Sequence, residues 1–243
     1  MLGICPVSSA SLDSGQLRSG LSLSYFTGYP NYVPVNLGTA FNGGRITSLA
    51  ATAVGSTILV TVYDFSDSGP ASPSVYDSVG NTYTLVTSQA INNVDSTNGS
   101  ILIYSSVSTV ALAVGSTVTY TSNSVNPQTS SQLSVTNIYT YGQPISIDTA
   151  VTAKSFGSST AATVTSGTPT KANEYFIGFL FSSGFSGVIN PSGWSVSTSP
   201  PIRANAGYDL LGGQVNTTTS PLTFAQTLTS TSTWAVIIIA YKY

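Results

Sequence analysis

An all-β fold is predicted by three features of the sequence. Short runs rich in β-branched and aromatic residues recur along the chain, and clusters of Gly, Pro, Asn and Ser separate them. No stretch shows a sustained helical period flanked by capping residues. The length of 243 residues suits a single large sandwich. We therefore expect an Ig-like or jelly-roll β-sandwich head, preceded by an extended N-terminal tail strand.

The tail is assigned to residues 1–45 and the head to residues 46–243. The tail is rich in Ser, Gly, Pro, Asn and Tyr and contains one alternating stretch, residues 20–26. Alternation places every second side chain on one face of an extended strand. We expect one face to carry Leu21, Leu23 and Tyr25, and the other Ser22, Ser24 and Phe26.

Within the head, three apolar runs are predicted to be the core strands: Thr57–Phe65, Tyr175–Phe181 and Trp234–Tyr241. Nearly continuous apolar runs indicate strands that are covered on both faces. Shorter strands are expected at Ser74–Tyr76, Thr82–Val86, Ser100–Ser105, Thr117–Thr121, Leu133–Tyr141, Trp194–Ser197, Ala206–Leu211 and Leu222–Leu228. The segment Ala-Val-Gly-Ser-Thr occurs twice, at residues 53–57 and 113–117, as a Gly-Ser turn leading into a strand. One short match does not establish a duplicated unit, so we assign a single head domain.

The composition argues against most enzyme classes. The chain has no histidine, and only 6 Lys+Arg and 8 Asp+Glu. Histidine is the commonest general acid/base and the commonest metal ligand, so triad chemistry and zinc sites are excluded. The six cations are scattered, which argues against nucleic-acid binding. We expect no enzymatic activity and no cofactor, and we identify no catalytic, cofactor-binding or metal-binding residue.

Two kinds of carboxylate site still have to be weighed. Glycoside hydrolysis needs only two suitably spaced carboxyl groups. A calcium site at Asp64-Phe65-Ser66-Asp67, with Asp77 nearby, lacks the regular spacing of an EF-hand loop. Because most of these side chains are predicted to lie at strand ends or turns, backbone capping is the favoured role. The candidates are Asp64, Asp67, Asp77, Asp95, Asp148, Glu174 and Asp209.

Several features bear on location and surface. Cys5 is the only cysteine, so it can form no intrachain disulfide. Asn98 and Asn216 begin Asn-x-Ser/Thr sequons at predicted turns and are candidate N-glycosylation sites. No run of 18 or more apolar residues exists, so no membrane span is expected. The start of the chain lacks the pattern of a signal peptide, which fits either a mature exported chain or a virion protein.

The combination of an alternating tail strand and a Ser/Thr/Tyr-rich β head resembles the subunits of archaeal surface threads. Those filaments, like bacterial chaperone–usher pili, assemble by donor-strand complementation. The head is also similar to a bacterial extracellular β-sandwich module with a D-S-x-G-N-T-Y turn, here Asp77-Ser78-Val79-Gly80-Asn81-Thr82-Tyr83. The resemblance to threads implies a non-enzymatic subunit of a cell-surface filament that polymerises head to tail with copies of itself.

In that interpretation the donor strand and its flanks form the subunit interface. The expected interface residues are Leu21, Leu23, Tyr25, Phe26, Tyr29 and Tyr32. Two alternatives stay open at this stage. A virion component (capsid, turret or spike) would have partners of other sequence, and a carbohydrate-binding adhesin would bind surface glycans through exposed aromatic side chains.

Overall fold

The prediction of an all-β fold is confirmed. A computed structural model of the protein describes residues 33–40, 44–64, 72–94, 97–122, 131–139, 145–182, 188–189, 194–198 and 208–242. Side chains within 33–40, 63, 91–94, 97–99, 131–139, 188–189, 195–198, 208–212 and 214 are outside this description. The described residues contain strands and turns and no helix. They therefore contain no helix that could cross a membrane.

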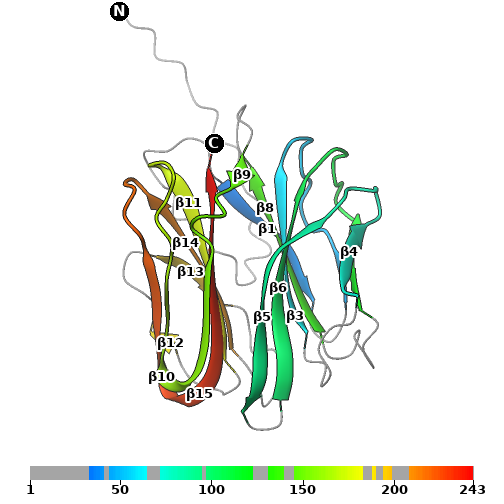
Figure 1. Ribbon diagram of the computed structural model, residues 1–243. Helices are drawn as coiled ribbons and strands as arrows, with labels where there is room; N and C mark the ends of the chain where they lie inside the picture. The colour runs from blue at the N-terminus through cyan, green and yellow to red at the C-terminus, as the bar shows by residue number, and fades with distance from the viewer. Residues whose placement is uncertain are drawn as a thin grey trace, which may run out of the picture.

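The strands form two large antiparallel sheets that stack face to face, with a small sheet on one side (Figure 1). Sheet A has the order β1-β8-β3-β6-β5. Its strands are β1 (Val33–Ala40), β3 (Thr57–Asp64), β5 (Thr84–Val94), β6 (Thr97–Val107) and β8 (Ser131–Tyr139). The small sheet B covers its outer face and contains β2 (Arg45–Thr47), β4 (Ser74–Asp77) and β7 (Thr117–Thr121).

Sheet C has the order β10-β15-β11-β14-β13, with β9 and β12 also paired to β15. Its main strands are β10 (Ala153–Thr165), β11 (Glu174–Ser182), β13 (Ser195–Thr198), β14 (Tyr208–Asn216) and β15 (Thr223–Lys242). The short strands are β9 (Ser146–Ile147) and β12 (Val188–Ile189). All pairings in this sheet are antiparallel.

The core consists of three apolar clusters. Two of them lie between sheets, and the third covers the outer face of sheet C. The central cluster lies between sheets A and C and combines Leu59, Ile101 and Ile103 with alternate residues of β11 and β15. The second cluster lies on the other face of sheet A, toward sheet B, and contains Ile58, Val60 and Val62 of β3 with Leu102 and Tyr104 of β6. Both faces of β3, of β11 and of the second part of β15 (residues 234–241) are thus covered, which explains their continuous apolar sequences. These are the three strands predicted to form the core.

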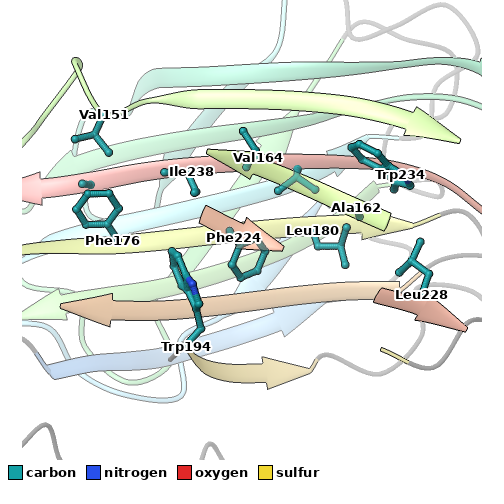
Figure 2. Close-up of a cluster of buried hydrophobic side chains, with 12 residues drawn as sticks. Val151, Ala162, Val164, Phe176, Leu180, Trp194, Phe224, Leu228, Trp234 and Ile238 are labelled. Carbon is teal, nitrogen blue, oxygen red and sulfur yellow. The ribbon is translucent and has the colours of Figure 1, made fainter. Parts of the chain in front are cut away.

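The third cluster covers the outer face of sheet C (Figure 2). β15 is 20 residues long and pairs with β10 along two stretches, with a register irregularity between Ser159 and Ala161. Its first part places Phe224 against Gly178 of β11, and Trp194 packs edge-on against Phe224 with ring centroids 4.8 Å apart. The sequence had predicted two strands here, Leu222–Leu228 and Trp234–Tyr241, where the structure has one.

Candidate functional site

The main cluster of buried ionisable groups lies at the end of sheet C, where three strands bring Asp148, Glu174 and Lys242 together. β9 pairs with the end of β15, with Ser146 opposite Lys242 and Ile147 opposite Tyr241. Asp148 follows β9 directly, and its backbone N–H donates to the carbonyl of Ala240 at 2.9 Å. Glu174 begins β11, the neighbour of β15 on its other side. Strand pairing therefore sets the positions of all three side chains.

Asp148 is buried and accepts hydrogen bonds at both carboxyl oxygens. Oδ1 accepts from the N–H of Ala150 at 3.1 Å, and Oδ2 accepts from the N–H and the hydroxyl of Thr170 at 2.8 and 2.6 Å. Lys242 Nζ lies 3.5 Å from Oδ1. Burial alone would raise the pKa of Asp148, but the hydrogen bonds from Thr170, Glu174 and Ala150 outweigh it and hold the pKa well below its usual range.

Glu174 is fully buried and has an unusual environment for a carboxylate. Its Oε1 accepts from the N–H of Lys171 at 3.0 Å, whereas Oε2 has no hydrogen-bond partner as an acceptor. Burial, followed by the hydrogen bond shared with Asp148, raises the pKa of Glu174 to about 7. A protonated Glu174 can donate to Asp148, which removes the cost of an unpaired buried oxygen. The two carboxyl groups therefore hold one proton and one negative charge between them below neutral pH.

Thr170 links this carboxyl pair to the amine. Its Oγ1 donates to Asp148 Oδ2 and accepts from Lys242 Nζ at 3.0 Å. The cluster, which we call the carboxyl–lysine site, thus contains a proton-sharing acid pair and a primary amine in mutual contact. Because both carboxyl groups are at most 1% exposed, a polysaccharide cannot reach them in this conformation. Among the described residues, no group of three His, Cys, Asp or Glu side chains could hold a metal ion.

Of the other carboxylates that the sequence singled out, the two with described side chains, Asp64 and Asp77, lie apart from this site. Asp64 is buried and accepts a hydrogen bond of 2.6 Å from the hydroxyl of Tyr120. Asp77 caps a turn. The candidates Asp67, Asp95 and the side chain of Asp209 lie outside the described residues. The sequence identified Asp148 and Glu174 as carboxylate candidates but gave no sign of Lys242, because the three are far apart in the chain and only strand pairing joins them.

The D-S-x-G-N-T-Y turn is organised around the carboxylate of Asp77. Oδ1 accepts from the backbone N–H groups of Val79, Gly80 and Asn81 at 2.7 to 3.0 Å. Oδ2 accepts from Asn81 Nδ2 at 2.8 Å and the Tyr83 hydroxyl at 3.0 Å. The side chain of Asn81 then bonds to the backbone of Thr109 and Val110. This motif therefore has a structural role, in joining the turn after β4 to the loop after β6.

That loop belongs to a second surface feature, the paired loops, formed by residues 48–56 and 108–116. The two segments run antiparallel, and their hydrogen bonds repeat with an offset of 60 residues. Ser48 N–H donates to Ser116 and Ser108 N–H to Ser56, while Gly55 N–H donates to Ser108 and Gly115 N–H to Ser48. Gly55 and Gly115 both have positive φ, of 84° and 90°. The repeated Ala-Val-Gly-Ser-Thr segment was the sequence signal of this local two-fold arrangement.

The paired loops expose a group of apolar side chains. Four of them lie in the loops and one at the adjoining end of β6, with exposed fractions of 46% to 74%: Leu49, Val54, Val110 and Val114 in the loops, and Val107 in β6. Because contiguous exposed apolar patches mark contact surfaces, these side chains make the paired loops a candidate for one. Sequence reasoning missed this surface, because an apolar residue in a turn gives no sign of whether it is covered.

The predicted donor strand and its flanks (Leu21, Leu23, Tyr25, Phe26, Tyr29 and Tyr32), together with Cys5, lie outside the described residues. Residues Val33–Ala40, within the range assigned to the tail, form β1 and pair with β8 at the edge of sheet A. The edge position is compatible with Pro34, since an edge strand has a free side for a residue without an N–H group.

Of the two candidate glycosylation sites, Asn216 has a described side chain. It is buried, its Nδ2 donates to the carbonyl of Ser220 at 2.7 Å, and its Oδ1 accepts from Thr218. A glycan would replace one hydrogen of this Nδ2, in a residue that is 4% exposed, so its attachment would require the side chain to turn outward. Asn98 lies in β6, and its side chain is outside the described residues.

No protein-family model, curated protein or solved structure matches this chain.

Proposed function

We propose that this protein is a non-enzymatic structural subunit of an extracellular filament, which polymerises head to tail through a donor strand in residues 1–32. The observation that carries the proposal is the position at which β1 begins. Pro34 of β1 and Thr57 of β3 both pair with Ile138 of β8. The chain therefore enters sheet A at the end of the sandwich where β3 starts, and this is also the end that carries the paired loops.

This arrangement supports a contact between two copies of the chain. A neighbour that receives residues 1–32 is held close to the exposed aliphatic side chains of the paired loops. The donor strand and the paired loops then form one continuous interface. Such a contact uses different surfaces on the two subunits and does not close, so it grows a polymer.

The energetics favour the use of both surfaces. Burying each apolar side chain of a donor strand contributes about 1.5–3 kcal/mol. The loss of translational and rotational freedom on association opposes this with a free-energy cost of roughly 4–15 kcal/mol. A single strand that buries Leu21, Leu23 and Tyr25 is therefore marginal, and contact with Val54 and Val114 adds the remaining stabilisation.

The test is electron microscopy and light scattering of the purified full-length chain. We expect filaments from the unmodified protein and none from a variant that lacks residues 1–32, a deletion that leaves β1 intact. Leu21→Asp with Leu23→Asp should also abolish polymers at unchanged chain length. Val54→Ser with Val114→Ser should weaken assembly, whereas Phe156→Ser, a matched change at an exposed side chain of β10, should not.

Two results would contradict the proposal. Filaments that persist in the Leu21→Asp, Leu23→Asp variant would show that residues 1–32 do not act as the donor. A monomer that binds glycans saturably would favour the adhesin alternative instead.

A further inference from the structure

We propose that Lys242 and Asp148 become joined by an intramolecular amide bond, formed without any other protein and promoted by Glu174. The inference rests on the carboxyl–lysine site and does not depend on filament formation. Lys242 Nζ lies 3.5 Å from Asp148 Oδ1, so the amine and the carboxyl group already touch. Glu174 is fully buried, with Oε2 unpaired as an acceptor, and its Oε1 lies 3.5 Å from the Thr170 hydroxyl that also contacts Asp148 and Lys242.

The surroundings of Asp148 favour attack on its carboxyl carbon. Oδ2 accepts two hydrogen bonds from Thr170, one from the backbone N–H and one from the hydroxyl. Donors held in this way stabilise the negative charge that develops on an oxygen when a nucleophile adds to a carboxyl carbon. The hydroxyl of Thr170 also accepts from Lys242 Nζ at 3.0 Å, which holds the amine at the same carboxyl group.

Glu174 supplies the proton transfer that the reaction needs. Below neutral pH the acid pair carries one proton, and Lys242 carries three hydrogens on Nζ. The ammonium first gives one proton to the acid pair, which leaves a neutral amine and two protonated carboxyl groups. The amine attacks the Asp148 carboxyl carbon, the C–O bond to one oxygen breaks, and that oxygen leaves as water after accepting a proton from Glu174. The amine nitrogen passes its second proton back to Glu174.

The atoms and charges balance without a further reactant. Four hydrogens begin on Nζ and the acid pair, and they end as one on the amide nitrogen, two in water and one on Glu174. One positive and one negative charge disappear together, so the bond also removes an ion pair of which the carboxylate is 1% exposed. Water exclusion by burial helps the amide persist once formed.

The bond would join β15, the last strand of sheet C in chain order, to the residue that follows β9, the first. Lys242 is the final residue of β15, and Asp148 directly follows β9, the strand paired with that end. The end of a long strand is where a β ladder frays most easily. A covalent bond at this point therefore closes the sheet where backbone pairing stops.

Intact-protein mass spectrometry of the purified full-length chain tests the proposal. We expect the unmodified protein to be lighter than its sequence mass by one water molecule. Trypsin cleaves after Lys and Arg, so the bond should join peptide 46–154, which contains Asp148, to peptide 204–243, which contains Lys242. Fragmentation of the joined peptide should locate the bond.

Three variants give the matched arms of the experiment. Lys242→Arg keeps the positive charge but cannot form the bond, and we expect its full mass. Glu174→Gln keeps the shape of the side chain but cannot transfer the proton, and we also expect its full mass. Lys154→Arg, at a lysine that donates to the Ser88 carbonyl at 2.7 Å, should still lose one water. Circular dichroism of each variant checks that it is folded.

A folded wild-type protein of full mass would overturn the proposal and leave the Lys242–Asp148 contact as an ion pair. Loss of water in folded Lys242→Arg would assign the bond to other residues. Loss of one water from folded Glu174→Gln would show that the bond forms without Glu174.

Discussion

At the scale of single residues, the four carboxyl groups whose side chains the structure describes each have specific structural partners. All four are buried, and each accepts at least one hydrogen bond: Asp64, Asp77, Asp148 and Glu174. A buried carboxylate is tolerated only where donors surround it. The described carboxylates are therefore used inside the head, where hydrogen-bond donors offset the cost of burying them.

The turn at Asp77 gives a direct test of this role. Asp77→Asn keeps the size of the side chain but replaces one acceptor oxygen by a donor, which then faces the donors of Asn81 and Tyr83. Loss of a buried hydrogen-bonded acceptor costs about 1–3 kcal/mol. We expect the urea midpoint of Asp77→Asn to fall accordingly. Tyr83→Phe, which removes a single bond to Asp77, should lower it less, and equal effects of the two changes would contradict this account.

At the scale of elements, the sequence predicted the apolar strands well and the polar edge strands poorly. β3, β11 and the second part of β15 were recognisable because both their faces are covered and their sequences are apolar throughout. β10 was not predicted at all. Its sequence AKSFGSSTAATVT contains small and polar residues, and its exposed and covered positions alternate along an edge strand. Hydrogen bonding to β15 holds it in the sheet, and a single sequence does not reveal such a partner.

The candidate site was only partly predictable for the same reason. Asp148 and Glu174 could be listed as carboxylates, but their pairing depends on β9 and β11 lying on opposite sides of β15. The Asp77 turn was better predicted, because its residues are adjacent in sequence and turn chemistry is local.

The packing of β15 over β11 can be tested at Gly178. A Cβ atom at this position would lie 2.5 Å from Cδ2 of Phe224, which is fully buried in the outer cluster (Figure 2). Overpacking of this kind costs about 1–3 kcal/mol. We expect Gly178→Ala to lower the free energy of unfolding by that amount in urea titrations. Phe224→Leu in the same chain should restore part of the loss, and strictly additive effects would show that the two residues do not compete for space.

At the scale of the whole molecule, three strand ends lie at the same end of the sandwich. β1 begins, β3 begins and β15 ends at the same end of the sandwich, and Tyr241 of β15 donates a hydrogen bond of 3.2 Å to Ser105 of β6 across the two sheets (Figure 1). The start of β1, the paired loops and the carboxyl–lysine site therefore share one end of the head. A subunit pulled through its donor strand would be loaded at this end, which is where the proposed amide bond would resist unfolding.

The acid pair also sets how the stability of the whole protein depends on pH. In the absence of the amide bond, the pKa of Glu174 rises from 4.5 to about 7 on folding. Between these values the folded state binds more protons than the unfolded state, so stability falls as pH rises. Asp148 acts in the opposite sense, because its pKa is lowered on folding from 3.8. The stabilisation that Asp148 contributes is present above pH 3.8 and is lost as the pH falls below this value.

The two effects together predict greatest stability near pH 4, between the unfolded-state pKa values of 3.8 and 4.5. We expect the unfolding free energy of Lys242→Arg, which cannot form the amide bond, to fall by roughly 3 kcal/mol from pH 4.5 to 7 at about 1.4 kcal/mol for each pKa unit. Urea titrations at several pH values measure this slope. Adding Glu174→Gln should flatten it, since glutamine does not titrate. A Lys242→Arg protein whose stability rises over this range would show that Glu174 is already ionised in the folded state, and proton sharing with Asp148 would then be ruled out.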